Sequence, residues 1–337
     1  MFAHPPHRLF TLSERSVGLI AAVVTLLVWT AFILISRVAV DPSRGSTLNS
    51  FDIAYCRMAG AGLVLLPWGW FMVRRDKARA LGAASWLGLS PLPIGITLML
   101  GLIGSVVFAP IVYAGFSFAP ALHAAVLLPG SLPLWTALLA WWWLGDAMTP
   151  VRAMGLGLIV LGDLLVGGVS LLEAFDGGNV WKGDLLFMLG AMFWASYSVV
   201  ARQHRVEAVR ATIAITVLAC VSYVPVYTVL ALLQWVPSKL FLAPWQEVLR
   251  QLTFQGWGVV VVSGISFTQM IRHYGPVRST MITSLVPGLS AMGAVFLLDE
   301  PMSWNLALGL ALVTSGILLG VRAAVARPAV LAKVVPT

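Results

Sequence analysis

The feature that most constrains this chain is a series of ten apolar segments, each long enough to cross a membrane as a helix. A bilayer core about 30 Å thick requires about 20 apolar residues per helix. Of the 337 residues, 59% are hydrophobic and only 10% are charged, too few charges to cover a soluble globule. The sequence therefore predicts an all-α polytopic membrane protein. The predicted spans are residues 17–37, 51–73, 92–117, 121–143, 151–172, 183–203, 211–235, 256–274, 278–298 and 304–325.

The first span shares with a secretory signal the basic residues that precede it, Arg8 and Arg15. Its apolar run exceeds the roughly 7–15 residues of a signal core, and no clear cleavage site follows, so we expect a retained helix. The two cysteines, Cys56 and Cys220, lie in separate apolar segments without metal-ligand spacing. We expect them to be reduced packing residues, and we expect neither a metal nor another cofactor.

The distribution of positive charge predicts the orientation in the membrane. With a cytoplasmic N-terminus, 15 of the 21 Lys and Arg residues fall inside, five outside, and Arg57 within a helix. This bias is the positive-inside signature and predicts that both termini, including a tail at 326–337, are cytoplasmic. We expect the protein in the cell inner (plasma) membrane. The basic stretch at 74–79 would then face anionic lipid headgroups, and no nucleic-acid partner is expected.

A long internal repeat is the second strong feature. The stretch "SLPLWTALLAWWWLGD" (131–146) resembles "LVPGLSAMGAVFLLDE" (285–300). A shift of 154 residues aligns Pro133 with Pro287, Asp146 with Glu300, Gly155 with Gly309 and Gly162 with Gly316. Near the start of each half, a shift of 165 aligns Gly18 with Gly183, Trp29 with Trp194 and Arg37 with Arg202.

Each repeat holds five spans, so the second copy must enter the membrane from the opposite side. The sequence predicts a first repeat at 17–172, an extracytoplasmic linker at 173–182 and an inverted second repeat at 183–325. Inverted repeats are a recurrent plan of secondary transporters, because two copies can expose a midplane site alternately to either side.

The chain resembles the drug/metabolite transporter superfamily, of the EamA type with ten helices. The resemblance rests on "GDLLFMLGAMFWASYSVVAR" (183–202), the Trp29 and Trp194 pair, Arg57, and the two proline-to-acid stretches with their trailing glycines. It implies a cavity between the halves and export of small metabolites, commonly amino acids. Asp146 stands where the loop acid is usually Glu. Between Val17 and Val40 there is no acid that could serve as the coupling Glu of the small multidrug relatives.

We therefore expect a secondary transporter that moves small polar or amphipathic metabolites outward by alternating access, with amino acids or related compounds as the first choice. Export or import of nucleosides, sugars or cationic drugs is the alternative, and coupling to protons is left open. An enzyme is disfavoured because GxSxG, HExxH and paired acid motifs are absent. A scaffold would not account for an inverted repeat with matched prolines. Beyond a small-molecule substrate and the bilayer, we expect a monomer or weak dimer.

Candidate substrate contacts are side chains that combine apolar area with a polar group. They are Trp29, Trp194, Tyr197, Tyr113, Phe267 and Gln269. Pro133 and Pro287 each lack a backbone donor, so we expect them to kink their helices and to serve as a gate or site.

Two charges, Arg57 and Asp163, lie deepest within spans, where charge is costly. At 1.5 Å per residue they reach similar depths, which predicts an ion pair between them. The alternatives are that Arg57 pairs with Asp52 or extends its side chain to the interface, and that Asp163 binds a proton.

Several other residues receive structural interpretations. Residues 141–143, all Trp, are predicted to lie at the membrane interface, and His123 and His273 near helix ends. The glycines between 155 and 168 predict a helix-packing face. The stretch at 244–252 predicts a separate interfacial helix, with Gln246, Glu247 and Arg250 on its polar face.

Overall fold

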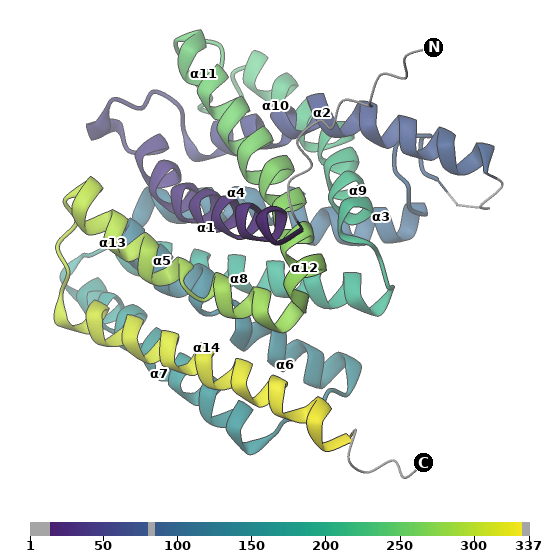
Figure 1. The fold of residues 1–337 in the computed structure, drawn as a ribbon. Helices are drawn as coiled ribbons and strands as arrows, with labels where there is room; N and C mark the ends of the chain where they lie inside the picture. Colours follow the sequence, from purple (N-terminus) through teal and green to yellow (C-terminus); the bar gives the residue numbers. More distant parts are fainter. Residues whose placement is uncertain (1–13, 80–84, 332–337) are drawn as a thin grey trace, which may run out of the picture.

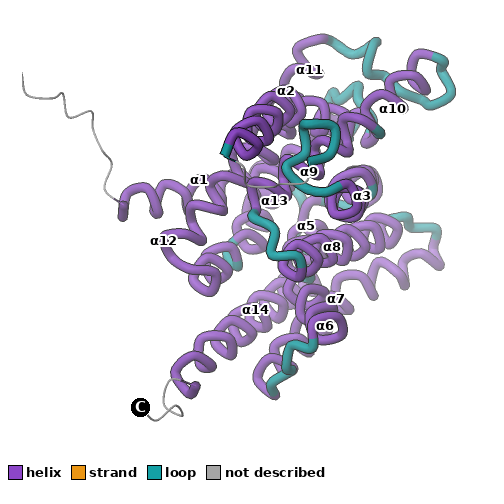
Figure 2. Tube along the Cα trace, turned by 90° about the vertical axis from the view of Figure 1, so that its right-hand side faces the viewer, coloured by secondary structure: helices purple, strands orange, loops and turns teal. Residues whose placement is uncertain are grey.

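The computed structural model describes residues 14–79 and 85–331, and these are nearly all helical (Figure 2). Ten helical spans are long and apolar enough to cross a membrane, which confirms the predicted architecture. The first five are α1 (Glu14–Ala39), α2 (Ser50–Ala78), α3 (Ile94–Gly101) with η2 (Leu102–Val106) and α4 (Phe108–Phe118), α5 (Ala121–Ala125) with η3 (Val126–Gly130) and α6 (Leu132–Leu144), and α7 (Pro150–Glu173).

The second five spans repeat this order. They are α8 (Val180–Gln203), α9 (Ala208–Val221) with α10 (Tyr223–Leu232), α11 (Trp245–Gln251) with η5 (Leu252–Val262) and most of α12 (Ser263–Thr283), the end of α12 with α13 (Val286–Leu298), and α14 (Trp304–Leu331). Two short turns, η1 (Pro42–Arg44) and η4 (Ala174–Asp176), follow α1 and α7. Of the expected tail, residues 326–331 extend α14, and 332–337 lie outside the described residues.

Local sequence fixes where the helices begin and end. At the start of α2, the Asn49 side chain accepts backbone hydrogen bonds while Asp52 accepts one from Asn49, which is a capping box. At the start of α7, Thr149 accepts a hydrogen bond from the Arg152 amide, and Pro150 takes the first helical position. Gly145 ends α6 with a φ of 68°, a conformation that suits glycine.

The last spans of the two repeats, α7 and α14, lie side by side (Figure 1). A Cβ on Gly155 would lie 2.7 Å from the Gly316 carbonyl oxygen, and one on Gly162 would lie 2.6 Å from that of Gly309. Gly316 is the repeat equivalent of Gly162, and Gly309 is the repeat equivalent of Gly155. The two contacts therefore exchange repeat partners, and α7 and α14 pack antiparallel. This is the pattern of an inverted repeat, and it confirms the predicted packing role for Gly155 and Gly162, whereas Gly157, Gly167 and Gly168 face open space.

Matching helices of the two repeats are also irregular at matching places. The third span of each repeat contains a π-helical segment, η2 in the first and η5 in the second. The fourth span of each is interrupted, at Ser131 in the first repeat and at Ser284 and Leu285 in the second. Such interruptions release backbone groups from the helical ladder and are tolerated inside a membrane where protein or a water-filled cavity satisfies them.

The alternating spans place the loops on two faces. We call one the Arg202 face; it holds the start of α1, the α6–α7 loop and the ends of α8 and α14. The other, the Arg37 face, holds the end of α1 and the α13–α14 loop. The positive-inside bias predicts that the Arg202 face is cytoplasmic.

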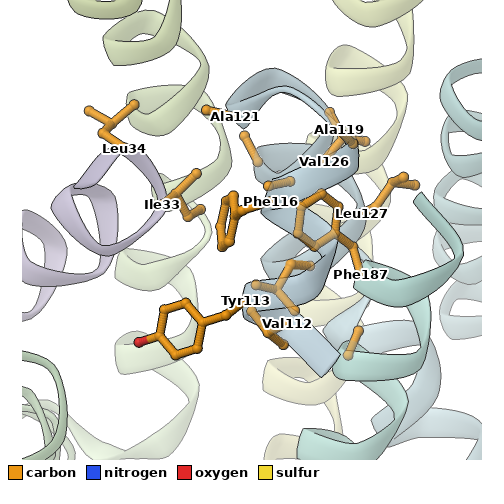
Figure 3. Close-up of a cluster of buried hydrophobic side chains, with 14 of the residues drawn as sticks. Ile33, Leu34, Val112, Tyr113, Phe116, Ala119, Ala121, Val126, Leu127 and Phe187 are labelled. Carbon is orange, nitrogen blue, oxygen red and sulfur yellow. The ribbon is translucent and has the colours of Figure 1, made fainter. Parts of the chain in front are cut away.

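Toward the Arg37 face, α1, α4, η3 and α8 pack closely around aromatic side chains (Figure 3). The rings of Phe116 and Phe187 meet with centroids 4.9 Å apart, and Ile33 and Leu127 lie on either side of them. Tightly interdigitated side chains leave no passage for a solute. The molecule is thus sealed in this half.

The separate interfacial helix predicted at 244–252 is wrong. Helix α11 runs directly into η5, so the span begins at Trp245 and not at residue 256. Glu247 is buried, not on a solvated face, because its carboxylate accepts hydrogen bonds from the backbone amides of Thr47, at 3.0 Å, and Leu48, at 3.2 Å. Trp245 is exposed instead, which suits a lipid-facing position.

Candidate functional site

A cavity of about 960 Å³ lies between the two repeats. Ligand pockets usually measure about 300–1,000 Å³, so it can hold a small metabolite. Its lining comes from the middle and the Arg202-face halves of the spans, and it reaches the α6–α7 loop at Asp146, Ala147 and Thr149. None of its lining residues belongs to a loop on the Arg37 face. The cavity therefore opens at the Arg202 face and ends at the packed half.

Aromatic side chains flank the cavity in two groups. On one side, Trp29 of α1 and Phe267 of α12 have ring centroids 5.1 Å apart. On the other, the Trp194 ring of α8 lies 4.9 Å from that of Phe108 and 5.0 Å from that of Tyr197. Four of the six candidate substrate contacts, Trp29, Trp194, Tyr197 and Phe267, thus line one cavity. They offer apolar faces on both sides of it.

The other two candidates do not line the cavity. Tyr113 is buried in the packed half and donates a hydrogen bond to Oε1 of Gln255, at 2.8 Å. Gln255 in turn lies 3.4 Å from the Ser36 hydroxyl, so the three residues tie α4, η5 and α1 together beyond the closed end. Gln269 is half-buried on α12 outside the lining. Gln255 was missed in the sequence, although it is a glutamine within an otherwise apolar run.

Pro133 and Pro287 occupy equivalent places. Each is the second residue of a helix that resumes after the break in its span, α6 for Pro133 and α13 for Pro287. Pro133 lines the cavity; Pro287 is buried beside Val286, which lines it. The gating role of the two prolines stays a prediction.

The predicted ion pair between Arg57 and Asp163 is wrong for this conformation. Asp163 accepts a hydrogen bond from the Ser131 hydroxyl, at 2.8 Å, and none of the ion pairs in the described chain includes either residue. Helix α2 packs against α4, α9 and η5, whereas α7 packs against α14 and α8. Equal depth in the membrane did not make the two residues neighbours.

The two alternatives considered for Arg57 are also not what the structure contains. Asp52 accepts hydrogen bonds from the Tyr227 hydroxyl, at 2.9 Å, and from the amides of Asn49 and Lys239, with no ion pair to Arg57. The guanidinium does not reach the interface; it lines the cavity and lies 5.7 Å from the Phe32 ring centroid.

Two ion pairs link the repeats at opposite faces. Arg37 Nε lies 3.8 Å from Oε1 of Glu300, and Arg202 Nη2 lies 2.7 Å from Oδ2 of Asp146. Arg37 aligns with Arg202, and Glu300 aligns with Asp146, so the two pairs are repeat equivalents. Both alignments are visible in the sequence, but the pairing of each arginine with the acid of the other repeat was not predicted.

The two pairs differ in what surrounds them. Glu300 also accepts hydrogen bonds from the Ala121 and Leu122 amides at the start of α5, both at 2.8 Å. Arg37 donates to the Phe116 carbonyl at 2.8 Å, which joins α1 to α4. The Arg202 and Asp146 side chains are more exposed, 54% and 31%. The closed face is therefore held by more, and better buried, polar contacts.

Two residues expected near helix ends or the interface have further contacts. His123, in the short helix α5, has Nδ1 2.8 Å from Oδ1 of Asp184, whose other oxygen accepts from Ser170. The side chains at 141–143 are exposed at the end of α6, as an interfacial position requires. His273 lies against Gly18 of α1.

Comparison with known proteins agrees with this architecture. Residues 16–168 and 181–322 match the model of the EamA-like transporter family. The chain is 26% identical over 223 residues to the uncharacterized transporter YyaM of Bacillus subtilis (strain 168), a match covering 66% of this chain and 71% of YyaM. A crystal structure 19% identical in sequence matches the fold with a TM-score of 0.51, over 90% of this chain and 95% of that one. The chain belongs to the EamA-like transporter family, within the drug/metabolite transporter superfamily.

Proposed function

We propose that this transporter moves small polar or amphipathic metabolites across the cell inner membrane by alternating access, in the outward direction, with amino acids or related compounds as the first candidates. The observation that carries the proposal is the cavity between the repeats, which opens at the Arg202 face and ends at a packed half. A solute that enters such a cavity can leave on the other side only after that half opens.

The repeat-equivalent ion pairs support an exchange between two states. In an inverted repeat, the second state is obtained when each half adopts the conformation of the other. Under that exchange, Asp146 takes the place of Glu300 at the closed face. Its pair with Arg202 is already formed in this conformation, so the contacts that distinguish the closed face are the backbone hydrogen bonds to Glu300. The fourth spans of the two repeats are interrupted at equivalent positions. These interruptions are places where the backbone can bend.

The proposed orientation places the Arg202 face in the cytoplasm, with both termini. It rests on the excess of Lys and Arg on that face. Fusion of a reporter that is active only in the cytoplasm to the C-terminus tests it, and an active fusion is the expected result. An inactive reporter on a well-expressed protein would show that the C-terminus is not cytoplasmic. It would contradict the proposed orientation and the proposed direction of transport.

Counterflow in proteoliposomes tests transport. Vesicles loaded with a pool of unlabelled amino acids should take up labelled ones faster than protein-free vesicles. The variant Thr136→Trp, which fills the cavity, should remove the uptake, whereas Leu138→Trp on the exposed side of the same helix should keep it. Uptake that is equal in both variants would contradict passage through this cavity. A folded protein without uptake would exclude amino acids and bring forward nucleosides, sugars or cationic drugs.

Proton coupling is proposed for Asp163. The carboxyl is buried next to the break in the fourth span, and its Oδ1 has no hydrogen-bond partner in the described structure. An intramembrane carboxyl of this kind is a candidate proton site, because protonation removes its charge. Its contact with Ser131, at the break itself, offers a route from proton binding to helix geometry.

A further inference from the structure

The guanidinium of Arg57 is the starting point. Arg57 lies seven residues after the start of α2, inside a membrane span, and lines the cavity. Its Nη1 atom is buried and has no hydrogen-bond partner in the described part of the chain. A cation inside a membrane protein normally pairs with an anion or with backbone carbonyls, because an unpaired one is costly. Arg57 thus has a donor to spare.

The nearby protein groups do not supply a counter-charge. Asp52, one turn and a half earlier on α2, is engaged by Tyr227, Ser238 and backbone amides. The Tyr113 hydroxyl lies beside the guanidinium, but it is neutral and donates its hydrogen to Gln255. The Phe32 ring contributes only its π face.

Charged residues are distributed unevenly along the cavity. They are Arg57, Asp146, Arg152 and Arg202. The single acid, Asp146, lies at the mouth and is paired with Arg202. The deep part of the cavity therefore contains one charge, and it is positive. A cationic solute would meet Arg57 with no counter-charge, whereas an anionic solute would supply the one that is missing.

Four hydroxyl groups of the lining are weak candidates for donating a hydrogen bond to a solute. Thr136, Ser198, Thr212 and Thr268 donate their hydrogens to carbonyls one turn earlier in their own helices, at 2.8–2.9 Å. Their hydrogens are committed, so they offer lone pairs to a ligand rather than donors. Beside the neutral indole N–H groups of Trp29 and Trp194, Arg57 is the charged donor that remains for an oxyanion in the deep cavity.

We propose that the cavity binds organic acids, with the carboxylate held by Arg57 at the closed end and an aromatic or bulky apolar body between the Trp29 and Phe267 pair and the Trp194 group. This inference rests on the proposed transport function for its biological meaning. It narrows the substrate class to amphipathic carboxylates, in which a free ammonium group is not required. Guanidinium and carboxylate match in a planar, two-bond geometry, which gives the contact its specificity.

The test is a binding measurement with four probes that share one phenyl body. They are 3-phenylpropionate (an anion), L-phenylalanine (a zwitterion), 3-phenylpropanamide (neutral) and 2-phenylethylamine (a cation). Binding to the purified full-length protein in detergent is read from calorimetry and from the ligand-induced rise in melting temperature. The two carboxylates should bind about 10- to 100-fold more tightly than the amide, as a charge-assisted contact predicts, and the amine most weakly.

Variants connect this preference to Arg57. Arg57→Gln should reduce the preference for 3-phenylpropionate over the amide to less than about threefold, and Arg57→Lys should keep part of it. Arg250→Gln makes the same charge change at an exposed position on the Arg37 face and should leave the preference intact. Because Arg57→Gln removes an unpaired buried charge, the variant should melt no lower than the native protein without ligand.

Three results would overturn the proposal: equal or tighter binding of the amine, a carboxylate preference that survives Arg57→Gln, or no binding by any of the four probes. These outcomes are separate from those of the counterflow experiment. A protein that binds 3-phenylpropionate through Arg57 and yet moves nothing would contradict the proposed transport function alone. A protein that transports amines or sugars would contradict only the substrate class.

Discussion

Glu300→Ala should open the Arg37 face. The Glu300 carboxylate accepts two backbone hydrogen bonds at the start of α5, both at 2.8 Å, and its side chain is only 10% exposed. A hydrogen bond to a charged group contributes about 1.5–3 kcal/mol, so the low end for two such bonds is about 3 kcal/mol. These bonds exist while the Arg37 face is closed. Their loss should shift the conformational equilibrium about 100-fold away from the present state.

Asp146→Ala is the matched change on the other face. Arg202 and Asp146 approach to 2.7 Å, but both side chains are substantially exposed. Exposed ion pairs contribute about 0–1 kcal/mol, so this variant should shift the equilibrium less than about fivefold. The contrast between the two variants, made at repeat-equivalent positions, is the quantity to be measured.

Cysteine labelling provides the assay. A Thr136→Cys reporter in the cavity, with Cys56 and Cys220 replaced by Ala, is exposed to a membrane-impermeant maleimide from either side of oriented proteoliposomes. Labelling from the Arg37 face should be slow in the reporter background and in Asp146→Ala, and much faster in Glu300→Ala. Equal rates in the two variants would refute the reasoning, as would a Glu300→Ala rate that does not rise.

Three further results are expected. Gly162→Ala should lower the free energy of unfolding by about 1–3 kcal/mol because its Cβ would meet the α14 backbone, whereas Gly157→Ala, with open space around it, should not; thermal unfolding in detergent compares them. Asp163→Asn should retain counterflow exchange but lose the response of net flux to a pH gradient, and an unchanged response would remove Asp163 from coupling. Hydrogen bonds from Ser43, and then the positive charges of Arg37 and Arg44, lower the pKa of Asp41. The ionised carboxylate therefore stabilises the protein at neutral pH, and this stabilisation is lost as the pH falls through the lowered pKa. Asp41→Asn should reduce the melting temperature at pH 7 more than in acid.

The spans and their symmetry were readable from the sequence because they depend on composition and spacing. The glycine-rich stretch at 155–168 predicted a packing face, and Gly155 and Gly162 do pack closely on α14, although the partner helix was not predicted. The start of the eighth span was not readable. Hydropathy counts Glu247 as a polar residue at an interface, while the structure satisfies it with amides from the distant segment after α1.

The position of each residue around the helix bundle was the other feature that the sequence did not predict. Residue number along a helix gives the depth of Arg57 and Asp163 in the membrane, but not the direction each helix face takes around the bundle. Four of the six candidates, all aromatic, line one cavity. Tyr113 was assigned to the cavity by type, although it lies behind the closed end, where it bonds to Gln255. Such distinctions depend on which spans are neighbours, and sequence periodicity does not contain that information.

The hydrogen bonds that Glu300 accepts at the start of α5 bear on which side of the membrane the protein faces when no solute is bound. At the repeat-equivalent positions of Ala121 and Leu122 stand Gly275 and Pro276, and proline has no amide hydrogen to donate. At these positions only the Gly275 amide is therefore available to the shorter Asp146 in a closed state, whereas Glu300 accepts from two amides. Under the proposed cycle, the unloaded protein waits with its cavity open to the Arg202 side. A solute on the Arg202 side binds to a state that is already populated. A solute on the Arg37 side requires the state that is open to that side, which is rare, and its apparent affinity is lower by the fraction of protein in that state. At equilibrium this creates no gradient, but it gives the two sides of the membrane different half-saturation concentrations for the same site.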